Sequence, residues 1–175
     1  MHAPAMSFPT RIGFDGALVI IARGAADRRL PVERVALAAL AVMVAGPAFA
    51  QGNPRGEAKA MVAGKAVSID YGQPALKGRD MLGQAQVGQA WRMGADAPTT
   101  LKTDADLAFG AASVPKGEYV LTATKIAADQ WHLNVLGKAD RSKVAEIPLA
   151  QGKLDPSVEL FTIILKGDKD KGQLE

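Results

Sequence analysis

The residues best suited to chemistry in this chain lie between positions 70 and 100. They combine carboxylates, cationic groups and hydroxyls, a mixture that suits a bound anion or sugar. The set comprises Asp70, Tyr71, Lys77, Arg79, Arg92, Asp96, Thr99 and Thr100. Arg92 follows the apolar Trp91, so its guanidinium would offer a planar fork of donors at the end of a strand. We therefore expect a binding site around these eight residues.

The sequence leaves three interpretations of this polar set open. In the first, the residues bind a small molecule or a partner without catalysis. In the second, Asp70, Arg92 and Asp96 converge in a concave pocket and serve a hydrolase or another enzyme. In the third, the protein is purely structural and has no pocket. For Arg92 itself, the simplest expectation is that it pairs with Asp96 or Asp70 and holds the turn of residues 94–98. We favour the first interpretation.

Other catalytic and metal-binding patterns are weak. Cysteine is absent, and His132 is the only histidine after residue 50, so no zinc ligand set is expected. Asp104 and Asp106 lack the third ligand, the glycine and the distal glutamate of a calcium loop. No G-x-S-x-G turn is present to carry a serine nucleophile. We predict no catalytic residue, no metal site and no cofactor.

The charge distribution does not indicate nucleic-acid binding. The formal net charge is +3. Residues 1–50 hold five arginines against three acidic residues, whereas residues 51–175 hold sixteen basic against fifteen acidic residues. No basic stripe with interleaved aromatic residues is present. We therefore expect no nucleic-acid partner.

The order of residues 28–51 is typical of a secretory signal peptide. Arginines precede the apolar run of residues 35–46, and small residues follow it. Ala48 and Ala50 suit the −3 and −1 positions, which predicts cleavage between Ala50 and Gln51. The run of about 12 residues is shorter than the roughly 20 that span a membrane, so no stable span is expected after cleavage. The protein is predicted to be exported, either to the periplasm or outside the cell.

The chain divides into three predicted parts. Residues 1–50 form an extension and the signal helix, and residues 1–27 are too long for an ordinary basic region, which points to a start codon assigned too far upstream. Residues 51–62 form a linker, in which residues 57–63 could make one or two helical turns. Residues 63–175 form the domain proper.

Period-two alternation predicts an all-β domain. In residues 65–71, Val67, Ile69 and Tyr71 share one face. Further short strands are expected at residues 91–93, 99–103, 107–109, 118–124, 131–136, 144–149 and 158–166. Pro148 favours an edge position for its strand. Seven or eight strands with frequent Gly and Pro turns predict an antiparallel β-sandwich, or else a jelly-roll-like fold or barrel. Trp91 and Trp131 are expected in its core rather than on a sugar-stacking platform.

The body also resembles a known family of secreted bacterial proteins, the one catalogued as domain of unknown function 2911. The marks that carry the resemblance span about residues 60–165 and comprise Asp70-Tyr71, Pro74, Lys77-Gly78-Arg79, Trp91-Arg92, Gly94-Ala95, Thr99-Thr100, Pro115, Gly117-Glu118-Tyr119 and Trp131. Asp96 stands where the family usually has Asn. The family typically continues with one more strand, and we expect that strand to be missing from this sequence.

The resemblance implies an exported, mostly β domain and no established activity. Together with the residue patterns, it predicts a non-enzymatic β-sandwich that binds a small molecule or a component of the cell envelope. An envelope hydrolase and a purely structural envelope protein are the alternatives.

Overall fold

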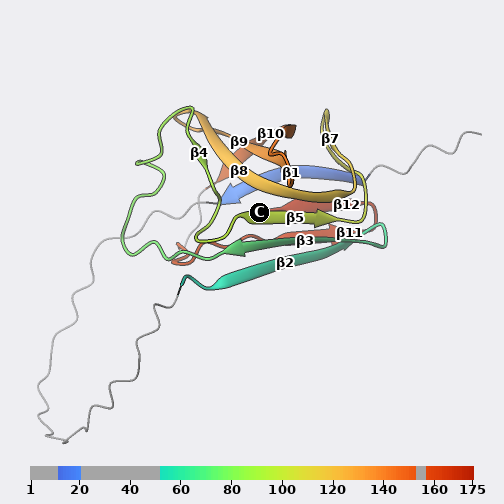
Figure 1. The fold of residues 1–175 in the computed structure, drawn as a ribbon, viewed down its shortest axis with the longest axis horizontal. Coiled ribbons are helices and arrows are strands. Elements are labelled where there is room, and N and C mark those ends of the chain that lie inside the picture. Colours follow the sequence, from blue (N-terminus) through green and yellow to red (C-terminus); the bar gives the residue numbers. More distant parts are fainter. Residues whose placement is uncertain (1–11, 21–51, 153–156) are drawn as a thin grey trace, which may run out of the picture.

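The computed structural model describes residues 12–20, 52–152 and 157–175, and these residues form strands, turns and loops without any helix (Figure 1). No helix that could cross a membrane occurs in this described part of the chain. The strands are β1 (Ile12–Ile20), β2 (Arg55–Val62), β3 (Lys65–Gly72), β4 (Ala90–Trp91), β5 (Thr99–Thr103), β6 (Leu107–Phe109), β7 (Ala112–Val114), β8 (Gly117–Ala127), β9 (Gln130–Gly137), β10 (Lys143–Gly152), β11 (Leu165–Asp168) and β12 (Lys171–Leu174).

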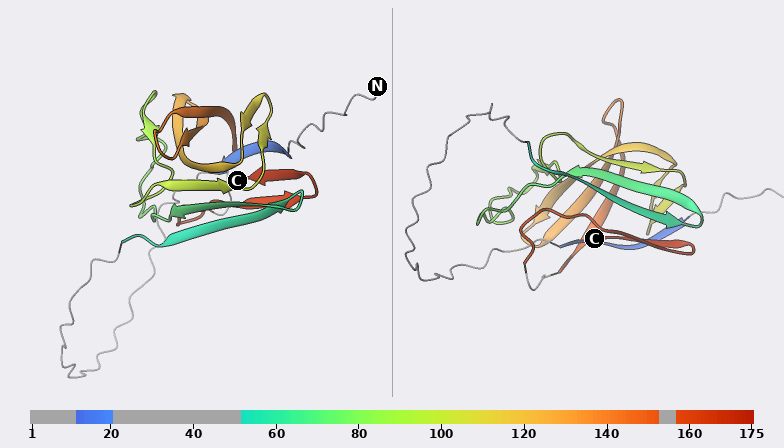
Figure 2. Two further views of the ribbon diagram at one scale, coloured as in Figure 1. Left: turned by 45° about the vertical axis from the view of Figure 1, so that its right-hand side comes forward. Right: turned by 90° about the horizontal axis from the view of Figure 1, so that it is seen from below.

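One strongly curved sheet makes both layers of the fold (Figure 2). Its main path runs β11-β12-β1-β10-β9-β8-β5-β3-β2, with β4, β6 and β7 attached to the side. The two end strands come together, because β11 packs against β2 and the amide of Ala63 donates to the carbonyl of Lys169. No ladder joins them, so the sheet folds over as a sandwich and is not a closed barrel. The predicted all-β sandwich is confirmed, and the described residues form twelve strands in place of the seven or eight expected.

Alternate side chains of the central strands fill the interior between the layers. Ile69 on β3, Leu121 on β8 and Leu133 on β9 are each 1% exposed. Burying a side chain of this size contributes about 1.5–3 kcal/mol to the free energy of unfolding. Asn134 on β9 is also buried, and its amide donates to the hydroxyls of Thr122 and Thr124 at 3.3 and 2.9 Å. The core is therefore apolar except where a polar side chain has its partners.

The prediction of a linker with a possible helical turn at residues 51–62 is wrong, because residues 55–62 form strand β2. β2 pairs with β3 over its whole length and buries Ala58 and Val62. Its sequence, RGEAKAMV, has only these two buried positions, so the alternation is too faint to identify a strand. The long antiparallel ladder to β3 holds residues 55–62 in the strand conformation.

The apolar run of residues 158–166 is not the single strand that its composition suggests. Of this run, only Leu165 and Lys166 belong to β11. The residues before them cross the end of the sandwich. Their backbone groups bond to the loop after β3: the amide of Phe161 donates to the Pro74 carbonyl at 3.0 Å, and the amide of Leu76 to the Glu159 carbonyl at 2.8 Å. Residues 158–164 therefore cover one end of the core, and only the last two residues of the run lie in a strand.

A further difference concerns the predicted leader. Residues 12–20 form β1, which lies between β10 and β12 and is parallel to both. β10 is consequently not an edge strand, although its pairing with β1 begins only at Leu149, just after Pro148. The apolar run of residues 35–46 and the cleavage residues Ala50 and Gln51 lie outside the described residues.

Candidate functional site

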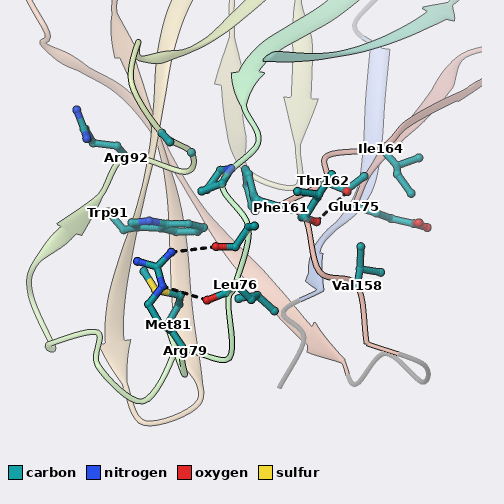
Figure 3. A pocket seen from close by; sticks show the side chains of 15 residues that line it. Leu76, Arg79, Met81, Trp91, Arg92, Val158, Phe161, Thr162, Ile164 and Glu175 are labelled. Atoms are coloured by element: carbon teal, nitrogen blue, oxygen red, sulfur yellow. Dashed lines mark hydrogen bonds between the residues drawn. The ribbon is translucent and has the colours of Figure 1, made fainter. Parts of the chain in front are cut away.

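A pocket of about 480 Å³ opens at the end of the sandwich covered by residues 158–164 (Figure 3). Three segments that are distant in the sequence form its walls: the loop of residues 74–81, the stretch of residues 91–95 and residues 158–164. Of its fifteen lining residues, only Arg79, Arg92, Thr162 and Glu175 carry polar or charged side chains. The pocket is therefore a mainly apolar site.

Aromatic contacts hold two of these walls together. The ring of Phe161 meets the ring of Trp91 edge-on at 5.2 Å and that of Tyr71 at 5.7 Å. The Tyr71 hydroxyl donates to the carbonyl of Ile163 at 3.3 Å. Trp91 in turn stands edge-on to Trp131 at 6.4 Å. Since such pairs contribute about 0.5–1.5 kcal/mol each beyond burial, the aromatic wall has a defined position.

A tight corner after Trp91 sets the upper rim of the pocket. Gly72 lies so close to Ala95 that a Cβ on Gly72 would stand 2.8 Å from the Ala95 nitrogen. The buried hydroxyl of Thr99 donates to the carbonyl of Met93 at 2.7 Å. Asp96 has a φ of 62°, a left-handed conformation that Asp tolerates better than most residues. The close approach of the Gly72 and Ala95 backbones and the hydrogen bond from the Thr99 hydroxyl thus fix this corner together.

The pairing predicted for Arg92 differs from the one observed. Its Nη1 donates to the carbonyl of Asp96 at 3.4 Å, and not to either carboxylate. The Asp96 carboxylate instead accepts from the backbone amide of Asn53 at 2.8 Å. Asp70 pairs with Arg55, whose Nη1 also donates to the carbonyl of Ala97 at 3.3 Å. Arg92 therefore bonds to the backbone of the corner, and Arg55 forms the pair with a carboxylate that the sequence suggests for Arg92.

The loop after β3 is held by its own arginine. Arg79 donates from Nε to the Leu76 carbonyl at 3.0 Å and from Nη2 to the Ala75 carbonyl at 2.9 Å (Figure 3). Lys77 has a φ of 50°, and its amide donates to the Glu159 carboxylate at 2.7 Å. These contacts tie the loop to the segment that closes the pocket. Arg79 thus stabilises the pocket wall through backbone carbonyls.

The eight predicted site residues do not form one cluster. Arg79 and Arg92 line the pocket, whereas Tyr71 and Thr99 are buried behind it. The four others, Asp70, Lys77, Asp96 and Thr100, do not line it. The pocket residues that the polar pattern misses are apolar, chiefly Leu76, Met81, Leu160 and Phe161. The apolar run of residues 158–166 signals Leu160 and Phe161, but its composition suggests a strand.

The described residues contain no group of three His, Asp or Glu side chains placed to hold a metal ion. Three carboxylates in the described part of the chain have a clearly lowered pKa: Glu118 on β8, Glu146 on β10 and Asp140 in the turn before β10. None of them lines the pocket. Hydrogen bonds from Lys138 and Lys143 are the main causes of the lower pKa values of Glu118 and Glu146, respectively. The chemical character of the pocket therefore comes from its apolar lining.

These features define a β-sandwich domain with an apolar pocket at one end. Residues 53–175 match the family described as protein of unknown function (DUF2911), and the chain belongs to that family. The match extends on both sides beyond residues 60–165, which carry the resemblance in the sequence, and it includes all of β2 and β12. No curated protein and no solved structure matches the chain.

Proposed function

We propose that this protein is an exported, non-enzymatic binding module of the cell envelope that holds a lipophilic small molecule. The pocket of about 480 Å³ carries the proposal. Its volume lies within the range of about 300–1,000 Å³ that is common for small-molecule sites. Its walls combine aromatic and aliphatic side chains, which favour an apolar ligand through the hydrophobic effect.

The arginines at the pocket favour an apolar ligand over an anion. Two of the guanidinium nitrogens of Arg79 already donate to backbone carbonyls. The Arg92 side chain points away from Phe161 and Val158 in Figure 3 and donates to the corner backbone. An anion in the pocket would have to compete with these contacts. The apolar part of a lipophilic ligand would not compete with them.

The alternative of an enzyme built on Asp70, Arg92 and Asp96 has less support. Arg55 pairs with Asp70, and Asn53 caps Asp96, so both carboxylates have structural partners. Neither carboxylate lines the pocket. A catalytic acid or base must reach the reacting group within hydrogen-bond distance. The geometry therefore favours binding over catalysis.

Export is supported by the order of residues 28–51 in the sequence. N-terminal sequencing of the protein recovered from the envelope fraction tests this part. A mature chain that begins at Gln51 would support export with cleavage. A chain that begins at Met1 and remains in the cell would contradict it.

Ligand binding can be tested on the full chain through tryptophan fluorescence, because Trp91 lines the pocket. Octan-1-ol serves as a plain apolar probe, and saturable quenching or enhancement is expected. Leu160 lines the pocket and is 40% exposed, so Leu160→Gln should weaken binding with little effect on folding. Ile126, which is 39% exposed and lies outside the pocket, provides the matched control Ile126→Gln.

Loss of about five-fold or more in octanol affinity is expected for Leu160→Gln, because a buried amide without a partner is costly. The control variant should bind as the unmodified chain does. Absence of saturable binding, or equal effects of the two substitutions, would overturn the proposal.

A further inference from the structure

A second hollow, of about 280 Å³, shares Trp91 and Met81 with the apolar pocket. Its lining differs sharply from that of the first. Three glutamines, Gln84, Gln86 and Gln89, line it together with Trp91 and the buried Trp131. No charged side chain lines it. We call this hollow the glutamine pocket.

The loop that carries the glutamines is fixed onto strand β8. The Lys125 ammonium donates to the carbonyls of Leu82 and Ala85 at 3.2 and 3.3 Å. The carbonyl of Lys125 accepts from the amide of Gly88 at 2.8 Å. The Gly83 amide also donates to the Asp80 carboxylate at 2.9 Å. One residue of β8 therefore holds both ends of the loop, and the glutamine pocket is built in advance of any ligand.

The glutamine amides are available to a ligand. Within the described part of the chain, none of the three side-chain amides has a hydrogen-bonding partner. Each amide can donate two hydrogen bonds and accept two, which matches hydroxyl groups that do both. An anion would lack a cationic partner here, and a cation would lack a carboxylate. Trp91 is only partly buried and adds an aromatic ring, on which the C–H face of a sugar ring can pack.

We propose that the ligand is an amphiphile with a neutral sugar or polyol headgroup, which binds in the glutamine pocket while its apolar part enters the larger pocket. This inference rests on the proposed function, because it extends the same site across Trp91. The shared wall of Trp91 and Met81 lets one molecule occupy both hollows. The chemistry is that of a glycolipid or an alkyl glycoside.

Three probes separate the parts of this proposal on the full chain. They are octyl β-D-glucoside below its micelle concentration, octan-1-ol, and methyl β-D-glucoside, each followed by calorimetry and tryptophan fluorescence. Octyl glucoside should bind about ten-fold or more tightly than octanol, because one or two hydrogen bonds to the amides add to the apolar contact. Methyl glucoside should bind much more weakly than either, since it lacks the apolar chain.

The double variant Gln86→Met, Gln89→Met replaces two amides by side chains of similar size. It should abolish the preference for octyl glucoside and leave octanol affinity unchanged. Gln151→Met, at an exposed glutamine of β10 outside both hollows, is the matched control and should keep the preference.

Each result either supports or overturns the sugar headgroup. The results that overturn the headgroup differ from those that overturn the proposed function. Equal affinity for octyl glucoside and octanol, or a preference that survives in the double variant, would overturn the sugar headgroup and leave lipophilic binding intact. Binding of methyl glucoside as tightly as octyl glucoside would overturn the amphiphile, because a free sugar would then suffice. Absence of binding by octanol and octyl glucoside alike would overturn both proposals.

Discussion

Arg55 on β2 pairs with Asp70 on β3 across the first ladder of the domain, and the same guanidinium reaches the carbonyl of Ala97. The side chains are 34% and 50% exposed, so the Coulomb attraction alone contributes little. The second contact gives Arg55 a larger role, because it joins the edge of the sheet to the corner at the rim of the apolar pocket.

Arg55→Met should therefore lower the free energy of unfolding by about 1 kcal/mol, since it removes an ion pair and a charged hydrogen bond. Lys59→Met is the matched control, because Lys59 forms only an exposed pair with Glu57 on the same strand. That variant should change stability by less than about 0.5 kcal/mol. Urea denaturation measures both values, and equal effects would show that the contact with Ala97 contributes nothing.

The sequence predicts the central strands because their burial alternates. Residues 99–103 and 107–109 have the bounds of β5 and β6, since each presents apolar or small side chains to one face only. The same rule fails at β2, where just Ala58 and Val62 are buried. It fails again at residues 158–164. An apolar run indicates that its side chains are buried, but it does not indicate which segment its backbone bonds to. There the amide of Phe161 bonds to Pro74 and not to a neighbouring strand.

The site was harder to predict than the strands, for a related reason. Polar residues draw attention in a sequence, yet Asp70 and Asp96 turn out to stabilise turns and ladders through Arg55 and Asn53. The apolar pocket consists of Leu76, Leu160 and similar residues, whose composition is that of any core. Only the fold brings these distant segments together around Trp91.

Gly72 should not tolerate a side chain. A Cβ there would clash with the backbone of Ala95, whose nitrogen would lie 2.8 Å away, so the corner would have to move. Gly72→Ala should cost about 2 kcal/mol or more and should also weaken octanol binding, because Ala95 lines the pocket.

The matched control for this prediction is Gly64→Ala. Gly64 has a φ of 71° but open space around its Cβ position. Its substitution should cost about 1 kcal/mol from backbone strain alone and leave binding intact. Thermal unfolding and the fluorescence titration together check the pair. A corner that accepts Gly72→Ala without loss of binding would contradict the role given to this close approach.

Tyr119 should make stability fall at alkaline pH. Burial, followed by the charge of Asp106, raises its pKa above the ordinary value of 10.0. The neutral hydroxyl donates to the Pro115 carbonyl at 2.7 Å. Its contribution is therefore fully present below pH 10.0 and is lost as the pH rises through the raised pKa. Tyr119→Phe should cost about 1 kcal/mol near neutral pH and should reduce this alkaline loss.

Glu118 and Glu146 should make stability fall in acid. Hydrogen bonds from Lys138 and Lys143, respectively, are the main cause that lowers each carboxyl pKa below the ordinary value of 4.5. Both contributions are present above pH 4.5 and are lost as the pH falls through the lowered values. Lys138→Met should return the pKa of Glu118 toward 4.5, as measured by NMR titration, and flatten the acid dependence of the melting temperature. An unchanged Glu118 pKa would contradict the pairing.

β1 offers a test that separates the full chain from an exported, cleaved form. Ala17 pairs with Leu149 of β10 and with Leu174 of β12, so it sits between two ladders. A proline there removes a backbone donor, and strands between two neighbours do not accept that change. Ala17→Pro should therefore lower the stability of the full chain by about 2 kcal/mol. If export removes residues 1–50, the protein recovered from the envelope should be identical with and without the substitution. A destabilised envelope form would mean that β1 is retained, and it would contradict cleavage at Ala50.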